Sequence, residues 1–366
     1  MPYTGVLNRY RPLLDIPEHT RQVTMLEGNT PLLPMSRLAA ELGGRFDLYV
    51  KVEGLNPTGS FKDRGMTVAI GEAVGRGAET VICASTGNTA ASAAAYAARA
   101  GLRCIVLIPQ GKVAAGKLAG AVAYGAQVIQ VEGSFDDALG LVIEISRKHP
   151  IALVNSLNPY RLEGQKTAAF EICDDLGEAP DWLCLPVGNA GNITAYWMGF
   201  QQYHARTGCG LPGLLGVQAA GAAPLVSGHP VEKPETIATA IRIGKPARGE
   251  QALAAAEESH GRIISASDAE ILTMQSSLAA EGLWVEPASA AGMAGFASEV
   301  LAGRLDPRGK RVVVVCTGHG LKDPEIIVHQ SALPSLIPAR LGSLEDAILA
   351  GKENSQNAYP QVLEHV

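Results

Sequence analysis

Short apolar runs without polar alternation recur along this sequence, and they constrain the fold more than any other feature. Residues 80–84 and 103–108 are two such runs, each followed by a helix-like segment. A strand with no polar side is buried on both faces, which is typical of parallel sheets covered by helices. Further strands are expected at 48–53, 127–131, 151–154, 182–186, 214–219 and 311–316. Helices are expected at 36–42, 88–100, 113–124, 135–148, 162–176, 191–207, 267–281 and 288–301. The chain is therefore predicted to be an α/β protein with mostly parallel, twisted sheets.

Length and composition limit the kind of protein further. A chain of 366 residues exceeds one small core and is long enough for two domains. With 47% hydrophobic residues, 18% charged residues and a net charge of −6, it should fold as an ordinary globular protein without a nucleic-acid-binding surface. No apolar run is long enough to span a membrane, and the N-terminus does not resemble a signal peptide.

The cysteines and histidines argue against disulfide and metal chemistry. The six cysteines show no CxxC spacing, and Cys83, Cys104, Cys184 and Cys316 lie in apolar strand-like runs. These four are expected to be reduced core residues of a cytoplasmic protein. The eight histidines are scattered without metal-ligand spacing, so no metal site is expected.

Lys62 occupies an unusual place for a lysine. The segment 56–65 (NPTGSFKDRG) joins the strand at 48–53 to a helix, with Ser60 as a plausible N-cap. Lys62 then falls in the first helical turn, where the helix dipole disfavours a cation. One interpretation is a solvated lysine at a strand–helix joint. The other is an amine that loses its proton in order to form a Schiff base with an aldehyde cofactor.

A glycine-rich loop follows the strand at 182–186 and opens a helix. Small residues let the backbone approach a ligand, and the free N–H groups of a helix start bind phosphate. The spacing is not G-x-G-x-x-G, so a dinucleotide site is a poor match, and a simple tight turn is the alternative. The loop consists of Gly188, Asn189, Ala190, Gly191 and Asn192.

Two more polar segments follow strand ends. Ser85, Thr86 and Asn88 come after the strand at 80–84, where Asn88 could donate to an oxygen of an aromatic cofactor, or a side chain could simply cap the helix. Thr317 follows the strand at 311–316 and could hydrogen-bond a ring nitrogen, whereas His319, between two glycines, is a weak candidate for a base. Together these segments offer an amine for an aldehyde, a donor for a phenolic oxygen, a loop for a phosphate and a neutral hydroxyl for a ring nitrogen. Those are the four groups of pyridoxal 5′-phosphate.

These motifs resemble those of the fold-type-II pyridoxal-phosphate enzymes, which include tryptophan synthase β, cysteine synthase and serine/threonine dehydratase. Within that group the threonine synthases are most similar. The resemblance runs from residue 28 to residue 324, almost the whole chain. Its segments are 28–32 (GNTPL), 51–66 (KVEGLNPTGSFKDRGM), 85–90 (STGNTA), 155–167 (NSLNPYRLEGQKT), 188–192 (GNAGN) and 317–324 (TGHGLKDP).

The resemblance implies a fold, a reaction and a substrate. The reaction would be elimination of phosphate from O-phospho-L-homoserine followed by addition of water, giving L-threonine and phosphate, with Lys62 as the catalytic base. Arg161, Asn155 and Ser156 are the first candidates for holding the substrate, and Lys51, Thr86 and Ser85 are further candidates. We also expect a homodimer, and an active site in the cleft between a small α/β domain (56–160) and a large one (1–55 plus 161–366).

Two alternatives stay open at this point. A serine/threonine dehydratase would differ only in the leaving group that its pocket accepts. A non-catalytic amino-acid or phosphate-binding protein could share the fold, although a binder has no use for a Schiff-base lysine.

Overall fold

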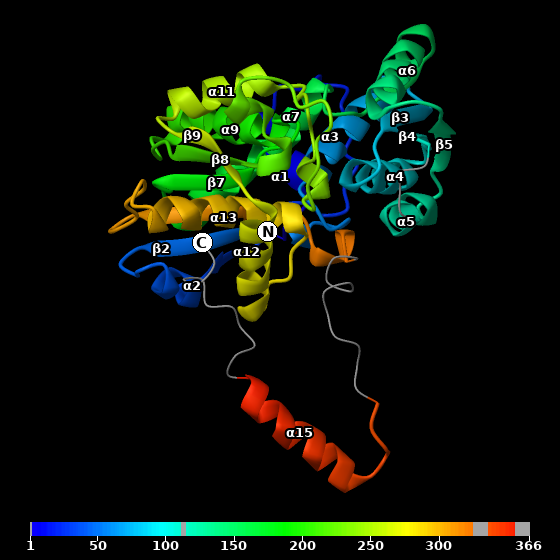
Figure 1. Ribbon diagram of the computed structural model, residues 1–366. Coiled ribbons are helices and arrows are strands. Elements are labelled where there is room, and N and C mark those ends of the chain that lie inside the picture. The colour runs from blue at the N-terminus through cyan, green and yellow to red at the C-terminus, as the bar shows by residue number, and fades with distance from the viewer. Residues whose placement is uncertain (1, 111–114, 325–335, 356–366) are drawn as a thin grey trace.

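The computed structural model describes residues 2–110, 115–324 and 336–355 of the chain. Its strands are β1 (Leu32–Pro34), β2 (Asp47–Val52), β3 (Thr80–Ala84), β4 (Arg103–Pro109), β5 (Gln127–Val131), β6 (Ile151–Leu153), β7 (Trp182–Pro186), β8 (Gly213–Ala219), β9 (Arg262–Ala266) and β10 (Arg311–Cys316). They form a six-stranded sheet in the order β1-β2-β10-β7-β8-β9 and a four-stranded sheet in the order β5-β4-β3-β6 (Figure 1). All neighbouring strands are parallel except β1 and β2. The predicted α/β fold is therefore confirmed.

Helices cover both faces of each sheet, as unbroken apolar strands require. The helices are α1 (Val6–Tyr10), α2 (Ser36–Glu41), α3 (Lys62–Gly75), α4 (Asn88–Ala100), α5 (Ala115–Ala123), α6 (Phe135–Lys148), α7 (Pro159–Gln165), α8 (Thr167–Leu176), α9 (Gly191–Thr207), α10 (Pro224–Ser227), α11 (Gly249–Glu258), α12 (Asp268–Ala280), α13 (Pro287–Leu301) and α15 (Leu341–Ser355). The six-stranded sheet packs against α2, α12 and α13 on one face and α8, α9 and α11 on the other. The four-stranded sheet packs against α3, α4 and α5 on one face and α6 on the other.

Strand β10 shows why a continuous apolar run is needed at the centre of the larger sheet. Val312 and Val314 point into the core that α13 covers, whereas Val313 and Val315 point into the core that α9 covers. All four side chains are fully buried. Because successive side chains of a strand alternate between faces, a polar residue anywhere in this run would enter one of the two cores.

The structure differs from the sequence-based expectations in several places. The helix expected at 162–176 is two helices, and the first begins at Pro159, where the side chain of Asn158 caps the backbone N–H of Tyr160 at 2.9 Å. Residues 249–266 contain α11 and the edge strand β9, which no pattern predicted because β9 is only partly buried. Ser60 is not the N-cap of α3; Phe61 precedes that helix. The first two residues of the helix expected at 113–124 lie outside the described residues.

Helices α3 and α7 cross at a pair of glycines. A Cβ atom on Gly65 would lie 2.7 Å from the carbonyl oxygen of Arg161, and Gly164 packs just as tightly against the backbone of Arg64. Neither position can hold a larger residue without separating the two helices. The crossing therefore fixes Arg161 of α7 relative to the N-terminal turn of α3, where Lys62 lies.

Helix α15 lies away from both sheets (Figure 1). Figure 1 shows α15 apart from the sheets and the helices that cover them, and its Leu341, Leu344 and Leu349 are exposed. No helix among the described residues is both long and apolar enough to cross a lipid bilayer.

Candidate active site

Lys62 is the first residue of α3, and backbone contacts pin its turn to the end of β10. Ser60 forms an isolated antiparallel bridge with Gly318, and the N–H of Phe61 donates to the carbonyl of Thr317 at 3.0 Å. Two segments more than 250 residues apart in sequence are thus held side by side. The structure therefore brings Lys62 and Thr317, two of the residues singled out from the sequence, into one corner.

The local electrostatics favour a neutral amine at Lys62. Its side chain is half-buried, and its Nζ lies 4.0 Å from the centre of the Phe61 ring. Burial, together with the nearby positive charge of Arg161, lowers the pKa of Lys62 to about 7, although Glu286 opposes that shift. A neutral amine is the form that attacks an aldehyde, so this lysine is prepared for covalent chemistry at neutral pH.

Asp63, the next residue, anchors the turn that carries Lys62. Its carboxylate accepts hydrogen bonds from the N–H and hydroxyl of Thr58, both at 2.6 Å, and from the hydroxyl of Ser92 on α4, also at 2.6 Å. Asp63 is fully buried. This carboxylate ties α3 to α4 directly beneath the lysine.

Arg161 is buried, and among the described residues it has no counter-ion. Its side chain is 1% exposed, and the one hydrogen bond that it makes to the described residues is long, 3.3 Å, from Nη1 to the carbonyl of Val154. Its Nε has no hydrogen-bond partner, and no carboxylate within the described residues forms an ion pair with it. Burial lowers the pKa of Arg161 to about 10, and the charge of Arg248 adds to that effect. A buried cation of this kind is costly unless an anion arrives to pair with it.

The loop that precedes α7 lies against the end of β3. Asn155 uses its side-chain amide to bond both backbone groups of Ala84, at 2.9 Å each, so it extends the strand pairing beyond β6. The two bonded residues are followed along the chain by the half-buried Ser85, Thr86 and Ser156. Asn155, expected to touch substrate, therefore has its polar groups engaged with backbone.

The loop 188–192 opens α9 as expected. Ala190 adopts a left-handed backbone conformation with φ of +66°, which turns the loop sharply into the helix. The Nδ2 of Asn192 in the first turn is buried and has no hydrogen-bond partner in the described structure. The start of a 17-residue helix and an unpaired buried donor together suit a phosphate group.

Two side chains that the sequence patterns did not single out contact the predicted residues. The hydroxyl of Ser289 lies 2.8 Å from the hydroxyl of Thr317, and the carboxyl of Glu286 accepts a 2.9 Å hydrogen bond from Asn88. Ser289 lies in the helix that was expected at 288–301, and Glu286 immediately precedes α13. No local sequence signal marks either residue, because their contacts with Thr317 and Asn88 join distant segments.

Arg248 is a third residue that sequence reasoning missed, because it lies in a stretch that could not be assigned. It immediately precedes α11, is half-buried, and donates to the carbonyls of Ser156 and Leu157 at 3.3 Å each. Its side chain also passes 3.9 Å from where a Cβ of Gly191 would lie. Arg248 therefore bridges the phosphate-loop candidate and the segment that leads to Arg161.

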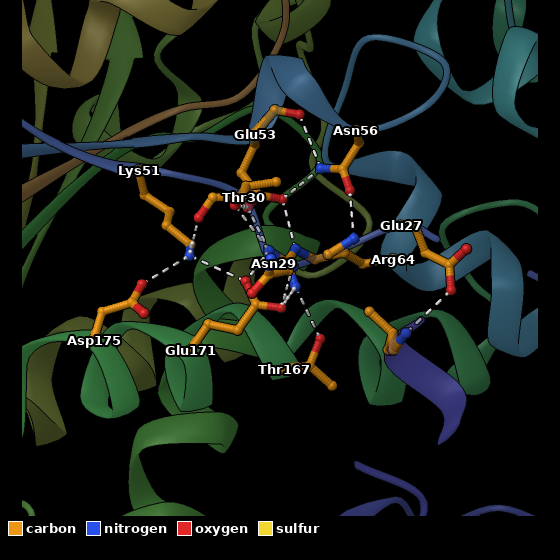
Figure 2. A network of polar contacts seen from close by, with 12 residues as sticks. Glu27, Asn29, Thr30, Lys51, Glu53, Asn56, Arg64, Thr167, Glu171 and Asp175 are labelled. Carbon is orange, nitrogen blue, oxygen red and sulfur yellow. Dashed lines mark hydrogen bonds and ion pairs between the residues drawn. The ribbon is translucent and has the colours of Figure 1, made fainter. Parts of the chain in front are cut away.

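Lys51 does not join this corner. Its Nζ is fully buried and lies 3.0 Å from Glu171, 3.5 Å from Asp175 and 2.7 Å from the carbonyl of Thr30 (Figure 2). Its ammonium group is therefore paired with two carboxylates and hydrogen-bonded to one carbonyl oxygen. The structure thus gives Lys51 a place in a separate ionic network, and it does not fit the substrate-binding role that the sequence suggested.

Comparison with known proteins identifies the class of enzyme. A family model described as "Pyridoxal-phosphate dependent enzyme" matches residues 23–318. The fold resembles solved structures of an O-ureido-L-serine synthase, with a TM-score of 0.72 at 20% identity over 96% of this chain and 100% of that chain. Maize serine racemase is similar, with a TM-score of 0.70 at 19% identity over 96% of this chain and 97% of that one. The chain belongs to the family of pyridoxal-phosphate-dependent enzymes, and pyridoxal phosphate is its cofactor.

Closer relatives narrow the assignment. The chain is 56% identical to the threonine synthase of Halalkalibacterium halodurans, over 91% of this chain and 95% of that protein. It is 57% identical to that of Synechocystis, over 90% and 86%, and 50% identical to that of Methanocaldococcus jannaschii, over 92% and 85%. The chain is therefore a lyase of the threonine synthase group, as its motifs indicated.

Proposed function

We propose that this chain converts O-phospho-L-homoserine and water into L-threonine and inorganic phosphate, and that Arg161 binds the phosphate of the substrate. The observation that carries this proposal is the buried, unpaired guanidinium of Arg161 close to Lys62. A phosphate monoester brings about two negative charges near neutral pH, and a guanidinium meets it with parallel hydrogen bonds. The phosphate of the substrate would supply the counter-ion that Arg161 lacks among the described residues.

Arg248 supports the same substrate class from the outer side of the pocket. It interacts with Arg161 electrostatically, and burial lowers its own pKa as well. Two nearby guanidiniums whose pKa values are both lowered are an unfavourable arrangement without an anion between or beside them. A dianionic leaving group relieves this repulsion more than a neutral hydroxyl does. The pair therefore favours a phosphorylated substrate over serine or threonine.

The chain also has groups that fit the cofactor. Lys62 would bind its aldehyde, the loop 188–192 its phosphate, Asn88 its phenolic oxygen and Thr317 its ring nitrogen. The orphaned Nδ2 of Asn192 and the depressed pKa of Lys62 agree with such a ligand. When bound, pyridoxal phosphate supplies the electron sink that makes hydrogens near the substrate amino group acidic.

Lys62 is proposed to move the protons. Once its Nζ is free, it can take the Cα proton of the substrate and later return a proton, because it is the amine held closest to the reacting carbons. A pKa near 7 suits both directions of transfer at neutral pH. Thr317, a neutral hydroxyl fixed by Ser289, would leave the ring nitrogen unprotonated. Ser85, Thr86 and Ser156 line the remaining loops, where they can position the carboxylate and phosphate of the substrate.

The assay that tests this proposal measures two products in parallel. The purified protein with pyridoxal phosphate is incubated with O-phospho-L-homoserine and, separately, with L-threonine. We expect stoichiometric phosphate and threonine from the first substrate and at most a trace of oxoacid from the second. Rapid oxoacid formation from threonine without phosphate release from phosphohomoserine would instead identify a dehydratase.

The domain division, the cellular location and the oligomeric state are also proposals. We propose a small domain formed by residues 56–160, a large domain formed by 1–55 and 161–366, and a site in the cleft between them. The four-stranded sheet comes entirely from the first range, which supports that division. We also propose a cytoplasmic homodimer, for which light scattering of the purified protein should give twice the mass of 38.2 kDa.

A further inference from the structure

Ser289 contacts Thr317, the proposed partner of the cofactor's ring nitrogen, and it is fully buried. It is the third residue of α13. A hydroxyl inside a helix commonly donates to the carbonyl four residues earlier. That carbonyl, of Val285, accepts a 2.7 Å hydrogen bond from Gln275 instead. Among the described residues, the Ser289 hydroxyl bonds only to residues 317 and 318.

The Ser289 hydroxyl has three polar neighbours and a single hydrogen. The backbone N–H of Gly318 donates to Ser289 Oγ at 2.7 Å. The Oγ1 of Thr317 lies 2.8 Å from Ser289 Oγ, and the carbonyl oxygen of Gly318 lies 3.2 Å from it. A serine hydroxyl offers one hydrogen and two lone pairs, and the N–H of Gly318 occupies one lone pair. The hydrogen of Ser289 therefore goes either to Thr317 or to the carbonyl of Gly318.

These two choices give Thr317 opposite hydrogen-bonding characters. If Ser289 donates to Thr317, the hydroxyl of Thr317 keeps its own hydrogen for another acceptor. If Ser289 donates to the carbonyl of Gly318, Thr317 gives its hydrogen to Ser289 and offers only a lone pair elsewhere. An unprotonated pyridine nitrogen accepts a hydrogen bond, so it suits the first arrangement. A protonated pyridine nitrogen donates one, so it suits the second.

The distances favour donation from Ser289 to Thr317. Hydrogen bonds between hydroxyl and oxygen are commonly about 2.7–2.8 Å long and seldom exceed about 3.0 Å. The contact with Thr317, at 2.8 Å, meets this criterion, and the contact with the Gly318 carbonyl, at 3.2 Å, does not. That carbonyl also accepts the N–H of Glu286 at 3.1 Å. The hydrogen of Thr317 is thus left available for a ligand.

We propose that Ser289 is a positioning residue, which donates to Thr317 Oγ1 and thereby directs the hydrogen of Thr317 to the ring nitrogen of the cofactor. The ring nitrogen would then stay unprotonated. A neutral ring nitrogen withdraws electrons less strongly than a protonated one, so Ser289 would set how strongly the bound cofactor acidifies the substrate. This inference rests on the proposed role of Thr317 in cofactor binding.

The test measures the protonation of the ring nitrogen directly. Wild type, Ser289→Ala and Thr317→Val are each loaded with pyridoxal phosphate that is isotope-labelled at that nitrogen, and its NMR chemical shift is followed against pH. A hydrogen bond to the unprotonated form lowers the pH at which protonation occurs. Ser289→Ala frees the Thr317 hydroxyl to rotate, so the midpoint should rise by about one pH unit. Thr317→Val removes the donor and should raise the midpoint at least as much.

Two further variants separate the hydrogen bond from packing. Ser289→Cys nearly preserves the size of the side chain but has only a weak S–H donor, so its midpoint should lie between those of wild type and Ser289→Ala. Ser259→Ala is the matched control. Ser259 is also buried, and its Oγ accepts the N–H of Leu214 at 3.2 Å and donates to the carbonyl of Ala256 at 3.0 Å. Its loss should leave the midpoint unchanged.

The variants at the two positions distinguish failure of the inference from failure of the proposed function. Suppose that Thr317→Val raises the midpoint, but Ser289→Ala leaves it unchanged or lowers it. Ser289 then does not direct the Thr317 hydrogen, and the inference is overturned while the role of Thr317 stands. Ser289→Cys decides the same question if Ser289→Ala does not fold. An unchanged midpoint in Thr317→Val would show that Thr317 does not bond the ring nitrogen, which overturns both.

Discussion

Two arginines of this chain are buried to the same degree and have opposite surroundings. Arg64 and Arg161 are each 1% exposed. Arg64 pairs with Glu53 at 2.7 Å and with Glu171 at 2.6 Å, and every member of its network is bonded to another (Figure 2). Arg161 has one long hydrogen bond to a carbonyl and an unpaired Nε.

The charge balance at the two places differs accordingly. Burial alone would lower the pKa of Arg64, but Glu171 and Glu53 outweigh it and hold that pKa well above its ordinary value. The same network lowers the pKa of Glu171 to about 2, because Arg64 and Lys51 more than offset burial. At Arg161 burial is the largest influence and lowers the pKa to about 10; Cys83 and Asp63 oppose that shift, and Arg248 adds to it. A buried charge that is fully paired holds elements together, whereas a buried charge left unpaired indicates where a ligand belongs.

The largest effect is expected from removing Lys62, in comparison with removing the ion-paired Lys51. Lys62→Ala should remove the absorption band of the lysine-linked cofactor and essentially all turnover, while the protein stays folded. Lys51→Ala is the control: it should lower the midpoint of thermal unfolding, because it leaves Glu171 short of one partner, yet keep the band. A Lys62→Ala protein that retains both band and turnover would show that the comparison assigns the wrong lysine.

Breaking the paired arginine should cost stability. Arg64→Leu leaves Glu53 and Glu171 buried without their cation, which typically destabilises a protein by about 3–5 kcal/mol. Urea unfolding followed by far-UV circular dichroism measures this loss. Arg161→Leu leaves no ion-paired carboxylate without its cation, and it removes a buried charge. The unfolding free energy of this variant should therefore be unchanged or higher. Equal losses in the two variants would remove the distinction between the sites.

Breaking the unpaired arginine should cost catalysis instead. Arg161→Ala should keep the cofactor band but lose about 2–5 kcal/mol in kcat/KM for phosphohomoserine, which is roughly thirty- to several-thousand-fold. Arg161→Lys should recover only part, because an ammonium cannot make two parallel bonds to phosphate. Any residual action on threonine, which carries no phosphate, should suffer much less. Loss of the cofactor in Arg161→Ala would mean that this residue binds cofactor phosphate and not substrate.

The smallest effect is expected at Arg248, and it tests whether Arg161 alone binds the substrate phosphate. It is half-buried, so its attraction to a phosphate is screened, and Arg248→Ala should raise KM for phosphohomoserine by about fivefold, near 1 kcal/mol. The difference from wild type should shrink as salt is added, whereas the Arg161 effect should persist. An Arg248→Ala enzyme with unchanged KM at low salt would restrict the phosphate pocket to Arg161.

The sequence by itself determined the framework and the chemistry. Unbroken apolar runs such as 311–316 require a two-sided cover, so parallel sheets followed from local pattern alone. Lys62 and the loop 188–192 were found because their motifs are contiguous and mark strand ends. Several element bounds, among them those of β3, α4 and α9, agree with the expected ranges because strong turn residues delimit them.

Only the tertiary structure decided which charges are paired. Lys51 and Arg161 look alike in sequence, each a cation beside a strand, yet one meets Glu171 across 120 residues of chain and the other meets no carboxylate in the described structure. Glu286 and Arg248 reach the site from segments that carry no local signature. Pairing and burial depend on contacts between distant elements, and a pattern that reads neighbours along the chain contains no information about them.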